Sequence, residues 1–443
     1  MTTLLADLEI ERLMALHPKG YDLSLDRVSR LLDRLGNPQL KLPPVIHIAG
    51  TNGKGSAAAF SRALLEEAGY RVHVHTSPHL VNWHERYRLA AEGGGRLVDD
   101  ELLAKTIARV AEANRGETIT VFEILTAVGF LLFAEHPADA VILEVGLGGR
   151  FDATNVIQSP AVSLIMPVSL DHEAYLGDRV ELIAAEKAGI IKRGCPVAIG
   201  AQETDAARIV LEETAERLDC PVQIYGQDFL AYEENGRMVY QDSDGLMDLP
   251  SPILPGRHQY ANAAAAIAAV RLAGFDIDHA AAERAMRSAS WPGRMQRLQY
   301  GHLVDLAPKG AEIWLDGGHN PGAGMVVAEA LVEQEERQPR PLFLIAGMIN
   351  TKDQAGYFRA FHGMARHVYT VPVSMSEAGV PNTELALRAQ EAGLSAEPVA
   401  SVANALMLLR DTWDSKEIAP RILIGGSLYL AGAVLAENGT PPT

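Results

Sequence analysis

The chain has 443 residues, of which 48% are hydrophobic and 21% are charged, and its formal net charge is −17. This length predicts two domains, and the acidic balance argues against a nucleic-acid-binding surface. The apolar runs are too short to span a bilayer and no export signal opens the chain, so we expect a cytoplasmic protein without a membrane partner. The two cysteines, Cys195 and Cys220, have no metal-binding spacing and fit a reducing compartment as ordinary core residues.

The first strand leads into a glycine-rich loop. Residues 45–56 read VIHIAGTNGKGS, in which a β-branched run predicts a buried strand, and an alanine-rich helix is expected at 56–70. Glycines let backbone N–H groups face an anion, and Lys54 adds a full positive charge. The Ser56 hydroxyl suits a magnesium ion that bridges phosphates. Only two residues separate Gly50 from Gly53, unlike the common G-x-x-x-x-G-K-[ST] spacing, yet the combination predicts nucleotide binding.

Strands and helices alternate after this loop. We expect strands at 71–75, 140–145, 161–167 and 195–199, and helices at 99–113, 121–134 and 205–218, with a long helix starting near 180. Residues 223–253 alternate without a helical period and carry the turn signal Glu234-Asn235-Gly236, which predicts a small antiparallel excursion. A helix at 262–274 follows. The alternation predicts a mostly parallel sheet covered on both faces.

A second α/β series begins after Trp291-Pro292-Gly293-Arg294, which breaks the chain. We therefore expect two domains, at 1–295 and 296–443. Strands are predicted at 312–315, 342–347, 367–371 and 421–424. Polar motifs follow two of these strands, at the edge where open α/β sheets bind ligands. The expected fold is a P-loop domain followed by a Rossmann-like α/β domain.

Three side chains in the first domain are candidates for chemistry. Glu144 ends a predicted buried strand, where a carboxylate suits a magnesium ion or a water, although a capping role is the alternative. His172 also follows a strand, and alone it would more often be a structural histidine. Lys187 alone would more often belong to a solvated helix face.

Read together, the motifs resemble those of one family. In chain order they are GTNGKGS (50–56), TSPHLV (76–81), EVGLGGR (144–150), DATNV (152–156), Asp171-His172, EKAGI (186–190), WPGR (291–294), DGGHNP (316–321), Gly347-Met348, Lys352-Asp353 and GSLY (426–429). This series resembles the folylpolyglutamate synthase/dihydrofolate synthase family of the Mur ligase superfamily, over about residues 21–436. The loop marks the superfamily, and the other motifs mark the folate branch.

The resemblance implies ATP and Mg²⁺ as cofactors, with ATP between the two domains. The nucleotide would be bound by Gly50, Thr51, Asn52, Gly53, Lys54, Gly55, Ser56, Asn262, Arg294, Asp316 and His319. Magnesium would be held by Ser56, Ser77, Glu144 and His172. Lys187 matches a lysine that is carbamylated in the superfamily, and with Lys54 and His172 it completes the implied catalytic set.

The resemblance also implies a pocket for a pterin. Its lining would be Leu23, Ser24, Leu25, Ser77, Pro78, His79, Thr120, Phe151, Asp152 and Ala153. The chain departs from the family pattern at Phe151, where leucine is commoner, and at Gly318, where alanine is usual. The glycines at 93–95 look like an insertion to which we assign no role.

The implied activity is ATP-dependent addition of L-glutamate to dihydropteroate, to reduced folates, or to both, by a monomer. ATP would turn a carboxylate into an acyl phosphate, because the carboxylate itself has no good leaving group. The alternatives are a Mur-type peptidoglycan ligase, a non-catalytic nucleotide switch and a small-molecule kinase. About 44 residues precede the first strand, which leaves no room for the extra N-terminal domain of a peptidoglycan ligase.

Overall fold

The computed structural model describes residues 4–16, 24–414 and 416–443 and confirms the predicted α/β class. These residues form two compact units, which we describe separately. The first comprises the chain up to residue 253 together with 259–290, and the second comprises 254–258 and 291–442. The sequence instead predicts a boundary after residue 295. The segment 291–295 groups with the second unit, where the Met295 N–H donates to the Asp316 carboxylate at 2.8 Å and the Gly317 N–H donates to the Gly293 carbonyl at 2.8 Å.

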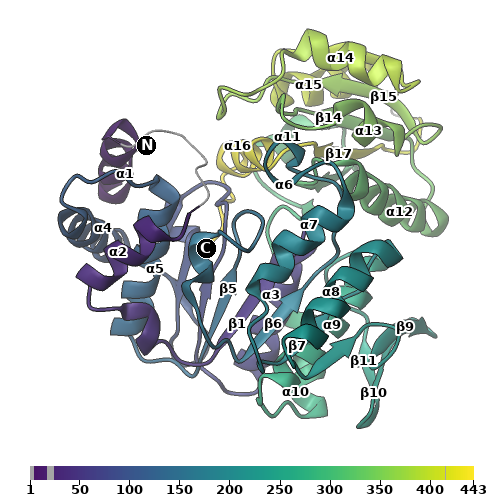
Figure 1. The fold of residues 1–443 in the computed structure, drawn as a ribbon. Coiled ribbons are helices and arrows are strands. Elements are labelled where there is room, and N and C mark those ends of the chain that lie inside the picture. Colours follow the sequence, from purple (N-terminus) through teal and green to yellow (C-terminus); the bar gives the residue numbers. More distant parts are fainter. Residues whose placement is uncertain (1–3, 17–23, 415) are drawn as a thin grey trace. The chain divides into compact units, whose positions relative to one another are not determined.

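An eight-stranded sheet with the order β4-β3-β2-β5-β1-β6-β7-β8 forms the centre of the first unit (Figure 1). Its strands are β1 Val45–Ala49, β2 Val72–His75, β3 Tyr87–Leu89, β4 Arg96–Leu97, β5 Ala140–Glu144, β6 Val162–Ile165, β7 Val197–Ile199 and β8 Val222–Ile224. From β2 to β8 all neighbours are parallel, whereas β3 and β4 add an antiparallel edge. The central strands β1, β5 and β6 are buried throughout, as a sheet covered on both faces requires.

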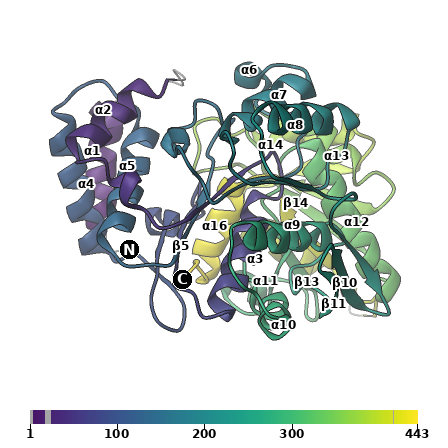
Figure 2. The same ribbon diagram turned by 60° about the horizontal axis from the view of Figure 1, so that its bottom comes forward.

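Helices cover both faces of this sheet (Figure 2). One hydrophobic cluster joins the sheet to α1 Leu5–Leu16, α2 Asp26–Arg34, α4 Asp100–Asn114 and α5 Val121–Glu135. A second cluster joins it to α7 Val180–Lys187 and α8 Asp205–Arg217. On the side away from α8 lie α3 Lys54–Glu67, α9 His258–Leu272 and α10 His279–Ser288. Most alanines of α3 and α9 are buried, and small side chains allow close packing.

The first unit differs from the sequence prediction at its antiparallel edge strands β3 and β4, which were not predicted, and at two further places. The helix that begins at residue 180 is short, because α7 ends at Lys187 and a 3₁₀ turn, η4 Ala188–Ile190, follows. A Cβ atom on Gly189 would lie 2.5 Å from the Arg150 Cα, so the chain packs against the loop at 149–150 there. The antiparallel excursion is present as β9 Leu230–Glu234, β10 Arg237–Asp242 and β11 Gly245–Pro250, but residues 222–224 pair with β7 in the main sheet.

The second unit holds a six-stranded sheet with the order β12-β13-β17-β14-β15-β16, in which only β12 is antiparallel. Its strands are β12 Gln296–Leu298, β13 Glu312–Leu315, β14 Leu342–Ala346, β15 Ala365–Thr370, β16 Ala396–Pro398 and β17 Arg421–Gly425. The helices are α11 His302–Leu306, α12 Pro321–Arg337, α13 Gln354–Arg359, α14 Asn382–Glu391, α15 Val402–Thr412 and α16 Leu428–Asn438. The loops after β13 and β17 carry the DGGHNP and GSLY motifs at one edge.

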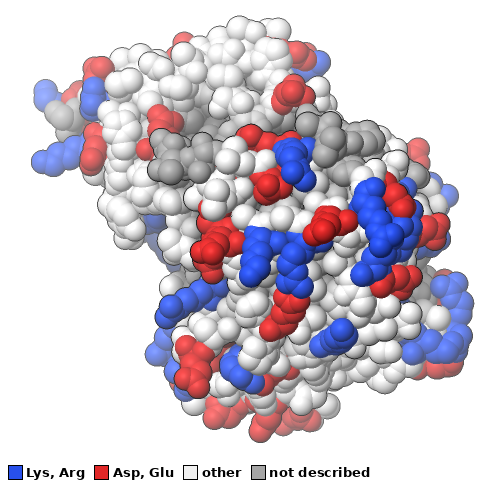
Figure 3. Space-filling model, turned by 90° about the vertical axis from the view of Figure 1, so that its left-hand side faces the viewer, with Lys and Arg blue, Asp and Glu red and all other residues white. Residues whose placement is uncertain are grey.

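Charges of both signs lie beside one another on the face drawn in Figure 3. Arg109 and Glu135 form one of the exposed ion pairs, at 2.7 Å. Among the helices that the structure describes, none is long and apolar enough to cross a membrane.

Candidate active site

The loop between β1 and α3 has the backbone of an anion cradle. Gly50 and Gly53 have φ angles of 154° and 81°, and Gly53 is the N-cap residue of α3. A Cβ atom on Gly50 would lie 2.6 Å from the Met166 Cβ, so only glycine fits. The Thr51 N–H donates to the Pro167 carbonyl at 2.8 Å, which ties the loop to the chain after β6. The first N–H groups of a helix point out of its N-terminus, so this end of α3 suits an anion.

Two lysines share one carbonyl of this loop. The Lys54 Nζ donates to the Gly50 carbonyl at 3.0 Å and to the Thr51 carbonyl at 3.3 Å. The buried Lys187, at the end of α7, donates to the same Gly50 carbonyl at 3.1 Å. Burial, reinforced by the charge of Lys54 and opposed by Asp171, lowers the pKa of Lys187 to about 7. Much of Lys187 is therefore a neutral, nucleophilic amine at neutral pH.

Ser77 and Glu144 meet because β2 and β5 are neighbours. The Ser77 N–H donates to the Glu144 carboxylate at 3.3 Å, and the Ser77 Oγ is buried with no hydrogen-bond partner. A buried hydroxyl oxygen beside a carboxylate suits a hard cation such as Mg²⁺. Ser56 is buried in the first turn of α3. His172, the N-cap residue of α6 Glu173–Leu176, lies 3.9 Å from the Asp171 carboxylate.

The described residues contain no group of three or more His, Cys, Asp and Glu side chains that could hold a metal by themselves. Mg²⁺ is usually bound by one or two carboxylates, with water and substrate phosphates completing its coordination. The Ser77 and Glu144 pair therefore fits a metal that arrives with a nucleotide.

Asn262 lies beside the loop through α9. Its Oδ1 is 2.9 Å from the position that a Cβ on Gly53 would take. Asn262 donates to the Gln259 Oε1 at 3.1 Å, and Gln259 donates to the Ser56 Oγ at 3.4 Å. Sequence reasoning missed Gln259. The available signal was its spacing, since it stands one helical turn before Asn262 and shares its face.

The residues expected to bind a pterin lie on several elements. Leu23 is outside the described residues, whereas Leu25 packs against the cluster of α2, α4 and α5, and the Ser24 Oγ contacts the Asp26 carboxylate at 3.2 Å. Thr120 caps α5 in a capping box with Glu123. Phe151 is exposed and Ala153 is buried.

Asp152 is already saturated by hydrogen bonds. Its carboxylate accepts from the N–H groups of Gly146, Leu147 and Thr154 at 2.9–3.0 Å and from the Thr154 hydroxyl at 2.5 Å. His47 contacts the same Thr154 hydroxyl at 2.9 Å. Burial raises the pKa of Asp152 and lowers that of His47 to about 3. A carboxylate with this many donors fixes the shape of the loop at 146–154.

Asp316 organises the motifs of the second unit. Its two carboxylate oxygens accept from the Met295 N–H at 2.8 Å and the Gly318 N–H at 2.7 Å. Burial raises the pKa of Asp316, and the charge of Arg294 opposes this rise. An Arg294 nitrogen lies 2.7 Å from the position that a Cβ on Gly317 would take. The structure thus brings Arg294 and Asp316 together.

His319 and Asn320 shape the start of α12. The His319 Nδ1 contacts the Gly317 carbonyl at 2.9 Å, and the Asn320 side chain caps the helix by accepting from the Ala323 N–H at 2.8 Å. These contacts hold the loop after β13 against α12.

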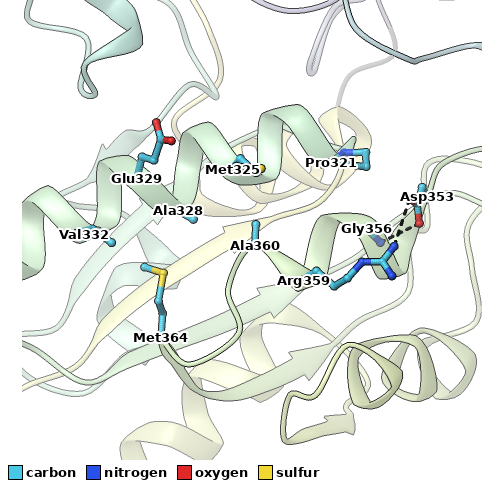
Figure 4. Close-up of a pocket in the computed structure, with 10 residues that line it drawn as sticks. All are labelled: Pro321, Met325, Ala328, Glu329, Val332, Asp353, Gly356, Arg359, Ala360 and Met364. Atoms are coloured by element: carbon cyan, nitrogen blue, oxygen red, sulfur yellow. Dashed lines mark hydrogen bonds and ion pairs between the residues drawn. The ribbon is translucent and has the colours of Figure 1, made fainter. Parts of the chain in front are cut away.

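An apolar groove of about 550 Å³ lies between α12 and α13 in the second unit (Figure 4). Its lining consists of Pro321, Met325, Ala328, Glu329, Val332, Asp353, Gly356, Arg359, Ala360 and Met364. Figure 4 shows Arg359 reaching toward Asp353, 3.8 Å away, at one end. The lining contains none of the residues predicted for nucleotide, metal or pterin, so this groove is separate from the candidate site.

The fold and the loop are those of a Mur ligase, since the family model of the Mur ligase middle domain matches residues 48–270. The dihydrofolate synthase/folylpolyglutamate synthase of Haemophilus influenzae is 34% identical over 355 residues, which cover 77% of each chain. A solved structure of Escherichia coli FolC in complex with DHPP and ADP is similar with a TM-score of 0.85 at 29% identity, over 98% of this chain and 97% of that chain.

A bifunctional folylpolyglutamate synthase/dihydrofolate synthase solved with Mn, AMPPNP and L-glutamate bound has a TM-score of 0.83 at 28% identity, over 98% of each chain. Within the Mur ligases, this chain therefore belongs to the dihydrofolate synthase/folylpolyglutamate synthase family.

Proposed function

We propose that this chain is an ATP- and Mg²⁺-dependent ligase that adds L-glutamate to dihydropteroate and to reduced folates. The observation that carries the proposal is the loop at 50–56, with two lysines on one carbonyl, in a chain of this family. The relatives bound to DHPP, ADP, Mn, AMPPNP and L-glutamate support the same substrates and cofactors. We further propose a monomer that works in the cytoplasm, and light scattering of the purified protein tests its oligomeric state.

The nucleotide phosphates would lie against the N–H groups of the loop and α3. The proposed nucleotide-binding residues of the first unit are Gly50, Thr51, Asn52, Gly53, Lys54, Gly55, Ser56 and Asn262, and those of the second unit are Arg294, Asp316 and His319. In this proposal the first unit binds ATP, and the second unit, to which residues 291–442 belong, completes the glutamate ligase.

Magnesium would be held by Ser56, Ser77, Glu144 and His172, and the unpartnered Ser77 hydroxyl supports this assignment. When bound, the ion neutralises phosphate charge and orients the transferred phosphoryl group.

Lys187 would carry a carbamate. The neutral amine is the form that reacts with CO₂, and a pKa of about 7 makes it abundant near neutral pH. The product is an anion that can hold a cation, which explains a buried lysine near carboxylates. A ¹³C NMR carbamate signal from protein in ¹³C-bicarbonate, lost in Lys187→Met, is the expected result, and its absence from the native protein rejects the modification.

The reaction would proceed through an acyl phosphate. The substrate carboxylate attacks the γ-phosphorus and ADP leaves, while Lys54 neutralises charge on the phosphates. The glutamate amine then attacks the acyl carbon, and phosphate leaves from the tetrahedral intermediate. The described side chains near the loop offer alignment and charge, so no covalent acyl-enzyme is needed.

The pterin would be bound by the segment at 23–25, the loop at 77–79, Thr120 and the loop at 151–153. Because the Asp152 carboxylate is already saturated, it would shape this pocket rather than accept from the ring.

An isotope experiment tests the function and its route together. Dihydropteroate or tetrahydrofolate with an ¹⁸O-labelled carboxylate is incubated with ATP, Mg²⁺ and L-glutamate, with Lys54→Ala as the control. We expect ADP release that requires both glutamate and acceptor, with one ¹⁸O atom in the released phosphate. Unlabelled phosphate would reject the acyl phosphate, and ADP release indifferent to both substrates would reject the ligase.

A further inference from the structure

The loop between β2 and β3 carries Ser77, Pro78 and His79, which the proposed function assigns to metal and substrate. Two adjacent residues that the function leaves unused, Glu85 and Arg86, make most of its side-chain contacts. They are the last two residues of the 3₁₀ turn η2 Trp83–Arg86, which leads directly into β3.

The Glu85 carboxylate binds the backbone of the loop. It accepts from the N–H groups of Leu80, Val81 and Asn82 at 2.7, 2.8 and 2.7 Å. The Glu85 carbonyl also accepts from the Thr76 hydroxyl at 3.3 Å. The Glu85 side chain therefore holds the end of the loop that lies nearer β3. Short hydrogen bonds to a charged acceptor are among the stronger hydrogen bonds in proteins.

Arg86 binds the ring of His79. The Arg86 side chain is 8% exposed, and its Nε donates to the His79 Nδ1 at 2.9 Å. Its guanidinium carbon lies 4.8 Å from the centre of the Trp83 ring, and the His79 and Trp83 rings are 4.2 Å apart between centres. The three side chains form one cluster, in which the His79 and Trp83 rings are tilted by 50° to one another, and these contacts fix the orientation of the imidazole.

This contact also sets the tautomer of His79. An Nδ1 that accepts a hydrogen bond carries a lone pair, so the ring is neutral and its proton is on Nε2. His79 is thus presented as a hydrogen-bond donor, suited to an oxygen atom of an anionic or carbonyl ligand.

The end of the loop nearest β2 contains Ser77, which with Glu144 forms the candidate metal site. The Thr76 N–H donates to the Arg86 carbonyl at 3.2 Å, and the next N–H, of Ser77, donates to Glu144 at 3.3 Å. The unpartnered Ser77 Oγ is therefore placed by a backbone that Glu85 and Arg86 hold on both sides.

We propose that Glu85 and Arg86 are positioning residues of this site, Glu85 setting Ser77 for the metal ion and Arg86 setting His79 as an Nε2–H donor to the carboxylate-bearing substrate. This inference rests on the proposed function and adds two residues to it. The two roles predict different defects, one in metal binding and one in acceptor binding.

The role of Glu85 in metal binding is tested with two variants. Glu85→Gln keeps one oxygen that accepts hydrogen bonds, and Glu85→Ala keeps none. We expect the Mg²⁺ concentration for half-maximal rate to rise about 10-fold in Glu85→Ala and less in Glu85→Gln. Mn²⁺ binding in the presence of ADP, followed by electron paramagnetic resonance, should weaken in the same order. Glu66→Gln is the matched control, because Glu66 accepts from the Gly95 N–H at 2.8 Å in another loop of the same unit.

The role of Arg86 in substrate binding is tested with the variants Arg86→Met, His79→Gln and His79→Asn. The Gln amide nitrogen replaces the Nε2 donor and the Asn nitrogen replaces Nδ1. We expect the KM for dihydropteroate to rise about 5- to 10-fold in Arg86→Met and His79→Asn, and to rise less in His79→Gln, which keeps a donor at the Nε2 position. The ¹⁵N NMR signals of His79, assigned by their loss in His79→Asn, should show a single Nε2–H tautomer in the native protein and a mixture in Arg86→Met.

Equal Mn²⁺ binding in Glu85→Ala and the native protein, with only a lower Tm, would overturn the role of Glu85. An Nδ1–H tautomer in the native protein, or equal effects of His79→Gln and His79→Asn, would overturn that of Arg86. Mn²⁺ binding and the tautomer are measured without turnover. They therefore remain decisive if the native chain shows no glutamate-dependent ADP release, the result that rejects the proposed function itself.

Discussion

Single residues at the loop carry most of the chemistry that we assign. The Gly50 carbonyl accepts from Lys54 at 3.0 Å and from Lys187 at 3.1 Å, so two cationic side chains converge on one oxygen. Burial lowers the pKa of Lys187 to about 7, so we propose Lys187 as the reactive amine of the pair and Lys54 as the phosphate-binding group.

Lys187→Met changes how stability depends on pH. Burial lowers the pKa of Lys187 to about 7 from 10.5, so between these values the unfolded chain binds more protons than the folded one. The free energy of unfolding of the native protein should therefore gain up to about 1.4 kcal/mol per pH unit from this lysine as pH rises through that range. The variant should lack this gain, as measured by urea unfolding at about pH 7.5 and about pH 9. Identical pH profiles would contradict the neutral lysine.

Gly53→Ala tests the close approach of Asn262 to the loop. The new Cβ would meet the Asn262 Oδ1 at 2.9 Å at a residue with a φ of 81°. We expect the KM for ATP to rise about 10-fold or more, because the cradle must widen. Gly69→Ala is the matched control, since Gly69 has a φ of 90° and nothing within 4 Å. An ATP KM equally unchanged in both variants would show that the contact is unimportant.

At the scale of elements, a buried arginine joins β17 to β13 and α12. Arg421 is 2% exposed, and it donates to Glu312 at 3.1 Å, to Glu335 at 3.1 Å and to the carbonyls of Gln334 and Gln338. Removing one partner of a buried ionic network leaves the other charges uncompensated.

Arg421→Met should therefore lower the free energy of unfolding of the second unit by about 3–5 kcal/mol. The exposed pair of Arg388 and Glu391, at 3.1 Å on α14, supplies the control, and Arg388→Met should cost less than about 1 kcal/mol. Denaturant unfolding of both variants gives the two values. An equal loss of unfolding free energy in both variants would mean that burial of the Arg421 network does not add to stability.

The elements show how far the sequence alone could reach. The inner parallel strands of both sheets and the loop at 50–56 are predicted, because β-branched runs and glycines act locally. The outer strands β3, β4, β8, β12 and β16 were not predicted as members of these sheets. The end of α7 was missed because Gly189 packs against Arg150, far away in the sequence. The strand order puts β5 between β1 and β2 and so joins Ser77 to Glu144, and this order arises from tertiary contacts that no local pattern encodes. Gln259 and Glu85 do carry local signals, which are the one-turn spacing from Asn262 and the capping box of Asn82 and Glu85.

The whole molecule divides its proposed site residues between two units. Residues up to 290 hold the loop, both lysines and Asn262, whereas Arg294, Asp316 and His319 belong to the second unit. A fragment of residues 1–290 should fold cooperatively and bind ADP more weakly than the full chain, without glutamate-dependent ADP release. Calorimetry and the ADP assay check both points. A fragment as active as the full chain would contradict a shared site.

The most direct test of the central claim is the mass of the product. The full chain is incubated with ATP, Mg²⁺ and L-glutamate, with dihydropteroate in one reaction and tetrahydrofolate in another, and the products are analysed by mass spectrometry. We expect a product one glutamate residue heavier in each reaction, formed together with ADP and absent for Lys54→Ala. Acceptors recovered unchanged while ATP is consumed would contradict the central claim.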